Sequence, residues 1–444
     1  VASSRLELMR RKLAERGLAQ NAAAEADERA LSDGQRRMWF VQALDPTGVL
    51  LNISLSYRLT GALDAGRLHT ALNAVARRHP VLRTTYAADE NGEPRAVLHD
   101  DLTPGWALHD LSEMSERARG LRLEVLAQRE FGRSFDLAAD APLRITLVRL
   151  AADEHVMLLV AHHIAWDDRS WRVFFADLTA AYGGADLGPA PRPPAPAPDT
   201  TDQDLAHWRA VLADPPEPLE LPGPTGSAVP TGFRSQRSSL ALAPETVAKV
   251  AVLARETGST PYMVLLAAFG VLIYRYTHTD DFLVASPVLN RGTDDAIGYY
   301  GNTVVMRLRP QPTRGFRELV LDTRDTALGA FAHQRINLDR VVRELNPDRR
   351  HGAERMTRVS FGFREPDGGG FRPEGVQCRR GDLRGHVTQL PLGFMVEWDG
   401  TNAVVEAEHL TEIIDADLAA RMLKSFAVLL DSALEHPQRP VARL

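Results

Sequence analysis

The most informative stretch of the chain runs from Leu159 to Trp171 and reads L-V-A-H-H-I-A-W-D-D-R-S-W. The apolar residues 156–161, which precede the two histidines, are typical of a buried strand. Successive side chains of a strand point to opposite faces, so we expect His162 and His163 to have different surroundings. An imidazole has an unperturbed pKa of about 6.5 and is therefore suited to handling protons near neutral pH. The same alternation argues against one shared ion, and we expect no metal site here.

Composition and length set the broad class. The 444 residues are 44% hydrophobic and 25% charged, with a formal net charge of −6, which is typical of a soluble globular protein of two or three domains. The sequence has no basic stripe with interleaved aromatic residues, which argues against nucleic acid as a partner. No apolar run reaches about 18 residues, so we expect no membrane span. The single cysteine, Cys378, excludes intrachain disulfides and favours a reducing, cytoplasmic location.

A proline-rich stretch divides the chain. Residues 187–201 read L-G-P-A-P-R-P-P-A-P-A-P-D-T-T, which cannot continue a helix or a central strand and predicts a semi-extended linker. We therefore predict an N-terminal linker helix and tether over 1–29, an N-terminal lobe over 30–186, the interlobe linker over 187–201 and a C-terminal lobe over 202–444. Because the chain begins with Val1 rather than Met, we expect it to be a segment of a longer protein.

Hydrophobic periodicity predicts helices and strands in both lobes, so the predicted fold class is α/β. The predicted helices are 4–18, 34–44, 65–78, 113–130, 170–182, 245–256, 261–276, 315–332 and 416–434. The predicted strands are 53–59, 81–86, 95–98, 143–150, 155–162, 282–285, 303–308, 359–363, 393–398 and 403–408.

The two histidines and Asp167 form the leading candidate site. The alternative is that both histidines are buried and hydrogen-bonded for structural reasons alone. The sequence contains no G-x-S-x-G nucleophile elbow, no H-E-x-x-H metal helix and no G-x-x-x-x-G-K phosphate loop. The missing nucleophile motif favours a histidine that acts directly between two bound substrates.

These residues and several further motifs resemble the condensation domains of nonribosomal peptide synthetases, which belong to the chloramphenicol acetyltransferase-like superfamily. The family's hallmark H-H-x-x-x-D-G stands here as H-H-I-A-W-D-D over 162–168. Other segments resemble family motifs in the family's order: L-S-D-G-Q-R-R-M-W-F-V-Q (31–42), R-H-P-V-L-R-T (78–84), D-L-A-H-W (204–208), I-G-Y-Y-G-N-T (297–303) and, more weakly, H-Q-R-I-N-L (333–338). The resemblance covers residues 30–444.

The resemblance implies a V-shaped pseudo-dimer of two lobes with an active-site tunnel at their junction. It implies that donor and acceptor arrive on the phosphopantetheine arms of two carrier proteins, and that the chain itself holds no cofactor. The acceptor's α-amine would attack the donor thioester and form a peptide bond. A neighbouring adenylation domain would belong to the same modular enzyme, which would make an antibiotic or a siderophore.

The resemblance also implies roles for single residues. His163 is the expected catalytic histidine, either as the base that deprotonates the amine or as the group that orients it. His162 and Asp167 would support the site, and Asp167 would form a salt bridge with Arg291 of the second lobe, across or near the lobe junction. The residues expected to line the tunnel or cleft are Trp166, Asp168, Arg37, Tyr300 and Asn302, with burial in the core as the alternative for Trp166.

Asp168 is the main departure from the family pattern, because glycine is usual there. Glycine tolerates a positive φ, which aspartate adopts only at a cost. A second carboxylate beside the site would also raise the pKa of His163. Recruitment domains of the family carry D-D but have lost the second histidine, so the retained His163 favours an active enzyme. A non-catalytic recruitment domain, an epimerisation domain and a stand-alone acyltransferase that uses coenzyme A thioesters stay open as alternatives.

Overall fold

The computed structural model describes residues 28–45, 47–191, 201–223, 226, 230–291, 296–345, 357–366 and 370–444. The predicted N-terminal helix and almost all of its tether, together with residues 192–200 of the predicted linker, lie outside the described residues. The chain divides into two compact units. The first takes its described residues from 1–196, 291–300 and 367–385, and the second takes the rest.

This division differs in one respect from the predicted boundaries. We predicted that 202–444 would form the C-terminal lobe as one segment, but 291–300 and 367–385 belong to the first unit. For 367–385 the physical cause is long-range pairing, since strand β12 (Val376–Arg380) pairs antiparallel with β2 (Asn52–Gly61). For 291–300 it is a set of hydrogen bonds to Asp167 and Ser170. Hydrophobic periodicity reports only local structure and cannot reveal such a pairing.

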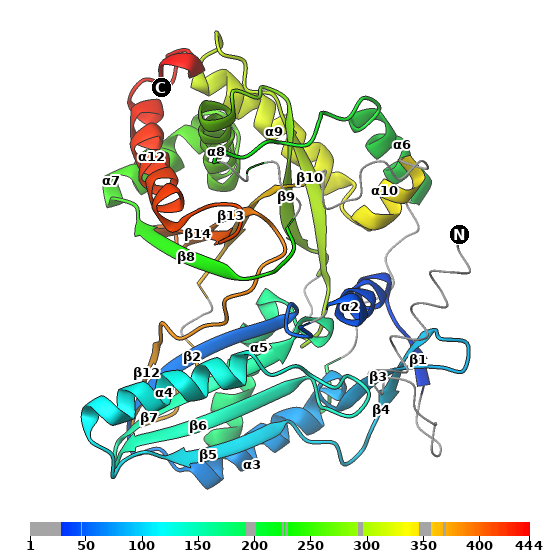
Figure 1. Cartoon of the computed structure of the whole chain (residues 1–444), viewed down its shortest axis with the longest axis vertical. Helices are drawn as coiled ribbons and strands as arrows, with labels where there is room; N and C mark the ends of the chain where they lie inside the picture. The colour runs from blue at the N-terminus through cyan, green and yellow to red at the C-terminus, as the bar shows by residue number, and fades with distance from the viewer. Residues whose placement is uncertain are drawn as a thin grey trace. The chain divides into compact units, whose positions relative to one another are not determined.

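The first unit is built on a five-stranded sheet with the strand order β12-β2-β7-β6-β5. Its further strands are β5 (Gly105–Asp110), β6 (Leu143–Ala151) and β7 (Glu154–His162). A small second sheet has the order β1-β4-β3 and consists of β1 (Glu28–Ala30), β4 (Pro94–Leu98) and β3 (Thr84–Ala88). The helices are α2 (Asp33–Leu44), α3 (Ala65–Arg78), α4 (Glu116–Phe131) and α5 (Asp168–Tyr182), with 3₁₀ turns η1 (Pro80–Arg83) and η2 (His163–Ala165). In Figure 1 the five-stranded sheet lies between α4 on one side and α3 and α5 on the other.

Strand β7 shows how the sequence produces these layers. Its odd-numbered residues, such as Met157 and Leu159, are buried in one core cluster with residues of α3 and α5. Its even-numbered residues, such as Leu158 and Val160, are buried in another cluster with residues of α2 and α4. This is the two-residue alternation of a strand that is covered on both faces. The same parity directs His162 toward the layer that contains α2.

The second unit is built on a six-stranded sheet with the order β10-β9-β11-β13-β14-β8. Its strands are β8 (Ser235–Ala241), β9 (Phe282–Leu289), β10 (Gly301–Leu308), β11 (Val359–Arg364), β13 (Leu392–Trp398) and β14 (Ala403–Leu410). Its helices are α6 (Thr201–Val211), α7 (Pro244–Glu256), α8 (Pro261–Thr277), α9 (Phe316–Ala332), α10 (Leu338–Leu345) and α12 (Ala416–Glu435), with a last 3₁₀ turn η3 (Val441–Arg443). The two large sheets with their helices confirm the predicted α/β class.

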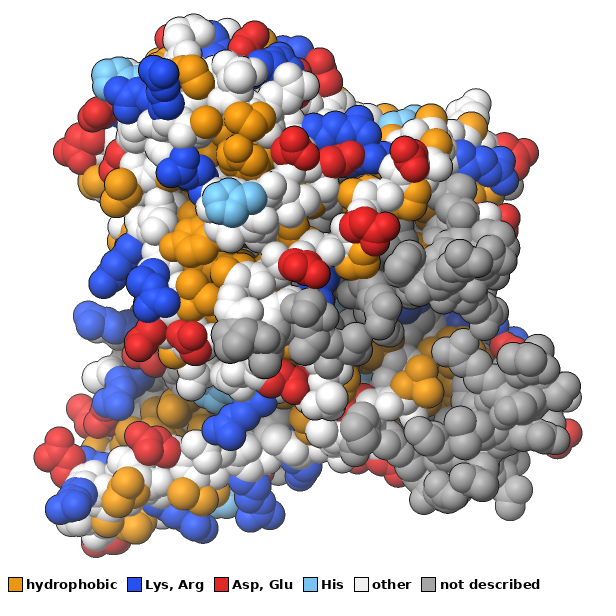
Figure 2. Space-filling model, turned by 45° about the horizontal axis from the view of Figure 1, so that its top comes forward, with side chains coloured by type: hydrophobic (Ala, Val, Ile, Leu, Met, Phe, Trp, Pro, Cys, Tyr) orange, Lys and Arg blue, Asp and Glu red, His pale blue; other side chains and the backbone are white. Residues whose placement is uncertain are grey.

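Helix α8 is the central helix of the second core. Its residues from Tyr262 to Ile273 are all buried, which fits a helix that is apolar on every side. Within the described residues no single helix has the length and hydropathy to cross a membrane, although α7 and α8 together meet both criteria as a pair bent by 106°. Figure 2 shows basic and acidic side chains interspersed on the visible face, as the small net charge suggests.

Several predicted elements need correction. The predicted strand 81–86 is a 3₁₀ turn up to Arg83, and β3 begins only at Thr84, because the fixed φ of Pro80 suits the first position of a helical turn. The elements that periodicity missed are β1, β5, β8, β12, α6 and α10. All four missed strands lie at sheet edges, where burial imposes less alternation on the sequence.

Candidate active site

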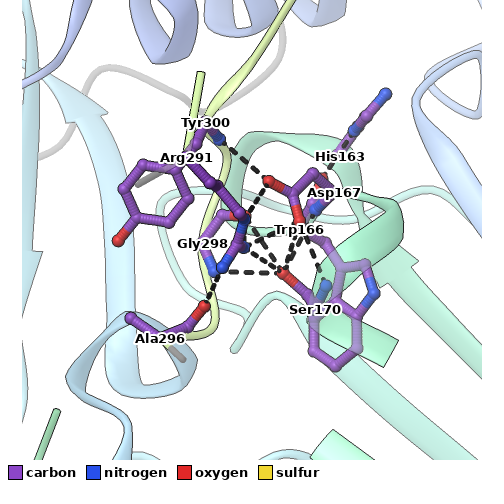
Figure 3. Close-up of polar contacts among 8 residues, drawn as sticks. All are labelled: His163, Trp166, Asp167, Ser170, Arg291, Ala296, Gly298 and Tyr300. Atoms are coloured by element: carbon purple, nitrogen blue, oxygen red, sulfur yellow. Dashed lines mark hydrogen bonds and ion pairs between the residues drawn. The ribbon is translucent and has the colours of Figure 1, made fainter. Parts of the chain in front are cut away.

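Asp167 and Arg291 form the predicted ion pair, which is buried (Figure 3). Both residues lie in the first unit, whereas we predicted that Arg291 would belong to the second lobe. Arg291 donates from Nε to Asp167 Oδ2 at 2.8 Å and from Nη2 to Asp167 Oδ1 at 2.7 Å. Such a two-point contact between a guanidinium and a carboxylate fixes both groups in orientation as well as in charge. The side chains of Arg291 and Asp167 are only 5% and 2% exposed, respectively, so the pair is shielded from solvent.

Asp167 is at the same time the N-cap of α5. Its Oδ1 accepts hydrogen bonds from the backbone N–H and the hydroxyl of Ser170, at 3.1 and 2.9 Å. Its Oδ2 accepts a further hydrogen bond from the backbone N–H of Tyr300, at 3.2 Å. The carboxylate thus joins the start of α5 to Arg291 and Tyr300. Because both of its oxygens are engaged in these hydrogen bonds, it supports the structure of the site and is not available to react with a substrate.

The segment around Gly298 completes this network. The carbonyl of Gly298 accepts from Arg291 Nη2 at 3.0 Å, and its N–H donates to Ser170 Oγ at 3.2 Å. A Cβ atom at position 298 would lie 2.6 Å from the ring of Tyr300, so only glycine fits there without displacing that ring. Arg291 also donates to the carbonyl of Ala296.

His162 is a wholly buried residue with both ring nitrogens in hydrogen bonds. Its Nδ1 accepts from the backbone N–H of Ile164 at 3.1 Å, and its Nε2 lies 3.2 Å from Oε1 of Gln42. The pKa of His162 is lowered to about 3, mainly by burial and to a lesser extent by the neighbouring His163 and Arg144. His162 is therefore neutral near pH 7.

His163 differs from His162 in the way that strand alternation predicts. It is the first residue of η2 rather than the last residue of β7, and it is partly exposed. Its Nδ1 lies 2.6 Å from the carbonyl oxygen of Trp166. A carbonyl can only accept, so Nδ1 carries the proton, and Nε2 of the neutral ring is left with a lone pair. Among the described residues, no hydrogen bond to this Nε2 is present.

The pKa of His163 is lowered, and burial is the main cause. The hydrogen bond to Trp166 and the charge of Asp167 act in the opposite direction, whereas Arg37 lowers the pKa further. We predicted that Asp168 would raise the pKa of His163, but the pKa lies below its usual value. Desolvation of the imidazolium outweighs the charge of Asp167, and Asp168 is not among the groups that shift this pKa most.

Asp168 sits in the first turn of α5 and is exposed. Among the described residues, His278 is the only one other than glycine with a positive φ, so Asp168 has none of the strain that the change from glycine led us to expect. An acidic residue is favourable in the first turn, where the helix dipole is positive.

The other predicted lining residues lie in different surroundings. Arg37, on α2, is partly exposed and acts electrostatically on His163. Tyr300 is partly exposed, and its ring lies 4.4 Å from the guanidinium carbon of Arg291. Trp166 is 0% exposed and packs edge-on against Phe174, so it belongs to the core, which is the alternative that the sequence left open.

Asn302 lies in the second unit and is buried. Its Nδ2 donates to the carbonyls of Gln334 and Ile336, at 2.7 and 2.8 Å. These contacts hold the turn that follows α9. They involve every donor of the amide, so Asn302 supports the loop instead of offering a donor to a ligand.

Two weaker sequence motifs meet in the second unit. Asp204 Oδ1 lies 2.9 Å from Nδ1 of His333, and the indole of Trp208 donates to the carbonyl of His333 at 3.0 Å. The ring of His207 stacks on that of His333. The segments 204–208 and 333–338 therefore form one structural contact between α6 and the end of α9.

Sequence reasoning missed Gln35, Gln42 and Ser170. Each contributes a side-chain hydrogen bond to the histidine segment or to Asp167. Ser170 has a local signal, because D-x-x-S spacing at the start of a helix suggests a capping contact. Gln42 has none, since its partner lies 120 positions away. No cluster of three or more metal-ligating side chains occurs among the described residues.

The family comparison covers nearly the whole chain. The family described as "Condensation domain" matches residues 25–444. The chain is 31% identical over 440 residues to a linear gramicidin synthase of Brevibacillus parabrevis, in a match that covers 93% of this chain and 8% of that protein. It is 32% identical over 349 residues to phosphinothricin tripeptide synthetase PhsC of Streptomyces viridochromogenes, in a match that covers 74% of this chain and 32% of that protein. The chain thus spans less than a third of the length of these curated relatives.

Solved structures share the fold. A four-domain nonribosomal peptide synthetase bound to AMP and glycine matches with a TM-score of 0.82 and 19% identity, over 96% of this chain and 35% of that one. The X-domain from teicoplanin biosynthesis matches with a TM-score of 0.79 and 22% identity, over 96% and 99%. The first condensation domain of the calcium-dependent antibiotic synthetase matches with a TM-score of 0.75 and 21% identity, over 94% and 99%. With the family match over residues 25–444, these findings show that the chain belongs to the condensation-domain family of nonribosomal peptide synthetases.

Proposed function

We propose that the chain forms a peptide bond between a donor aminoacyl or peptidyl thioester and an acceptor aminoacyl thioester, each on the phosphopantetheine arm of a carrier protein. The observation that carries the proposal is the state of His163. The ring is neutral, its Nδ1–H is fixed on the carbonyl of Trp166, and its Nε2 presents a lone pair from a partly exposed position. An amine can donate a hydrogen bond only to a ring nitrogen that carries a lone pair, and this tautomer places that lone pair on Nε2.

In the proposed reaction the neutral α-amine of the acceptor attacks the thioester carbon of the donor. The new C–N bond forms, the proton on that nitrogen passes to Nε2 of His163, and the C–S bond breaks as the intermediate collapses. The donor arm leaves as a thiolate and takes up the proton. The atoms balance without any further cofactor.

The direction of the pKa shift favours one of the two roles that the sequence left open. A free α-ammonium has a pKa of about 7.7–8.0, whereas the pKa of His163 lies below its usual 6.5. Removal of a proton from the ammonium by His163 before attack is therefore uphill. The nitrogen becomes much more acidic once it has bonded to the carbonyl carbon. We propose that His163 orients the neutral amine and takes its proton after the C–N bond has begun to form.

A non-catalytic recruitment domain is the second candidate, and Asp168 is the observation that favours it. The D-D pair at 167–168 resembles the pattern of such domains. The retained His163 favours catalysis, and the exposed position of Asp168 in the first turn of α5 explains how an aspartate is accommodated without distorting the site.

Reconstitution with separately loaded donor and acceptor carriers distinguishes the candidates. Intact-protein mass spectrometry should find the condensed product on the acceptor carrier. A donor that is only epimerised would indicate an epimerase, and product formed from a coenzyme A thioester as readily as from the donor carrier would indicate a stand-alone acyltransferase. Carrier binding without any product would favour the recruitment domain and would contradict the proposal.

A further inference from the structure

Helix α2 makes two side-chain contacts with the segment that carries His163. Gln42 is 5% exposed and meets Nε2 of His162 through its Oε1 at 3.2 Å. Gln35 donates from Nε2 to the carbonyl of Ile164 at 3.4 Å, which is a long hydrogen bond. The two glutamines are seven residues apart, so they lie two turns apart on one face of α2.

The hydrogen bonds of Gln42 have only one consistent direction. Nδ1 of His162 accepts from the N–H of Ile164, so the proton of the neutral ring is on Nε2, and Nε2 donates to Gln42 Oε1. The amide nitrogen of Gln42 in turn donates to the carbonyl of Gly48, at 3.1 Å. These contacts fix the tautomer of His162, because Gln42 Oε1 can only accept and the N–H of Ile164 can only donate.

The two contacts converge on Ile164, the residue that follows His163. The N–H of Ile164 is held by His162, and its carbonyl is held by Gln35. Ile164 and Ala165 also lie in the same core cluster as Met38, Trp39 and Ala43 of α2. Together these interactions fix the 3₁₀ turn in which His163 directs Nδ1 at the carbonyl of Trp166.

From these contacts we infer that Gln42 and Gln35 are positioning residues, which hold the turn η2 so that His163 keeps its Nδ1–H tautomer and presents Nε2 to the acceptor amine. The inference rests on the proposed function, because it deepens the role of His163. Neither glutamine has a contact with His163 itself among those that fix the turn, so both act through His162 or Ile164.

The local sequence allows the two roles of Gln35 to be separated. Gln35 also completes a capping box with Ser32, in which Oε1 of Gln35 accepts from the N–H of Ser32 at 3.1 Å. Gln35→Glu keeps this capping box and removes the donor to Ile164, while it adds a negative charge and alters the interaction of Gln35 with Tyr86. Ser32→Ala weakens the cap of α2 and leaves the contact with Ile164 in place. Gln128→Leu, at an exposed position of α4, is the matched control for Gln42→Leu.

The first measurement is condensation with loaded carriers by the whole chain. A displaced catalytic group typically costs up to about 100-fold in rate, and we expect Gln42→Leu and Gln35→Glu to lower kcat by at least about tenfold with KM for the carriers unchanged. Ser32→Ala and Gln128→Leu should keep the wild-type kcat. Wild-type kcat in folded Gln42→Leu and Gln35→Glu would overturn the inference.

The second measurement is the tautomer of His163, read from ¹⁵N-labelled histidine by NMR. We expect the Nδ1–H form in the wild type and a mixture of forms in Gln42→Leu and Gln35→Glu. If Gln42→Leu does not fold, Gln42→Glu replaces it. The acceptor oxygen at position 42 remains in this variant, so the Nδ1–H tautomer of His163 should persist. The added negative charge should raise the pKa of His162. An unchanged tautomer in Gln35→Glu together with an unchanged pKa of His162 in Gln42→Glu would overturn the inference. This readout needs no condensation, so it stands even if the wild type proves inactive and the proposed function fails.

Discussion

Removing either partner of the buried Asp167–Arg291 pair should destabilise the first unit, and the costs of the two removals should not add. Both side chains are almost completely buried and share two parallel hydrogen bonds. Removal of one partner leaves the other charge buried and uncompensated, which typically costs about 3–5 kcal/mol. We therefore expect Arg291→Met and Asp167→Asn each to lower the free energy of unfolding by about 3–5 kcal/mol.

The double variant should reveal the coupling. With Asp167→Asn and Arg291→Met combined, no buried charge remains, and asparagine still caps α5 through its oxygen. The cost of the double variant should therefore be less than the sum of the single costs by about 2–3 kcal/mol, at the upper end of coupling energies for residues in contact.

Thermal unfolding followed by tryptophan fluorescence measures these costs. For a unit of this size about 1 kcal/mol corresponds to a shift in Tm of about 2–4 °C, so each single variant should lower Tm by about 6–20 °C. Arg149→Met is the control, because its pair with Asp110 in the same unit is exposed and long, at 3.4 Å, and its loss should leave Tm unchanged. Additive costs in the double variant, or single variants as stable as Arg149→Met, would refute the reasoning.

Three further predictions concern other residues. His162 has a pKa of about 3 in the folded chain, so between that value and about 6.5 the unfolded chain binds a proton that the folded chain does not. The free energy of unfolding should therefore fall with falling pH in this window, by at most about 1.4 kcal/mol per pH unit. A Tm that stays flat from about pH 7 to about pH 5 would contradict this prediction. Asp168→Gly should lower the free energy of unfolding by about 1 kcal/mol, because glycine is a poor helix former, and should leave the condensation rate unchanged; a large gain in rate would show that Asp168 impairs the site. Asn302→Ala leaves two carbonyls without a donor and should cost about 2–3 kcal/mol in urea unfolding of the second unit, with the NMR signals of His163 unchanged as the control; a cost near zero would mean that water replaces the amide.

Elements with strong local periodicity were predictable from the sequence. The helix predicted over 65–78 has those limits in the structure, and the strand predicted over 155–162 differs by one residue. Strand alternation also predicted correctly that His162 and His163 would have different surroundings. In each case the pattern that identifies the element is also the pattern that buries it.

Contacts between distant parts of the sequence were not predictable in this way. The pairing of β12 with β2 joins residues more than 300 positions apart, and the strand itself, V-Q-C-R-R, has little apolar content. The Asp167–Arg291 pair was predicted through the family resemblance, because no local pattern links two residues 124 positions apart. Gln42 lacked both signals, since its partner His162 lies 120 positions away and only the folded structure brings the two side chains together.

The surroundings of Asp168 show a different limit. The sequence identifies the departure from glycine, but whether it matters depends on the local φ and on solvent exposure. The structure places Asp168 at the start of α5, where a carboxylate interacts favourably with the helix dipole. The concern about strain therefore came from the family pattern and not from the conformation of this chain.

The most direct test of the account is a single-turnover reaction with both carriers loaded, in which wild type and His163→Ala are compared by the amount of condensed product on the acceptor carrier. If His163 takes the proton from the amine, the variant should lose about 100-fold to 10,000-fold in the rate constant, as is typical when a general base is removed. Asp168→Gly should keep the wild-type rate constant, which shows that the assay responds to the histidine and not to any change near the start of α5. Equal rate constants for wild type and His163→Ala would contradict the central claim.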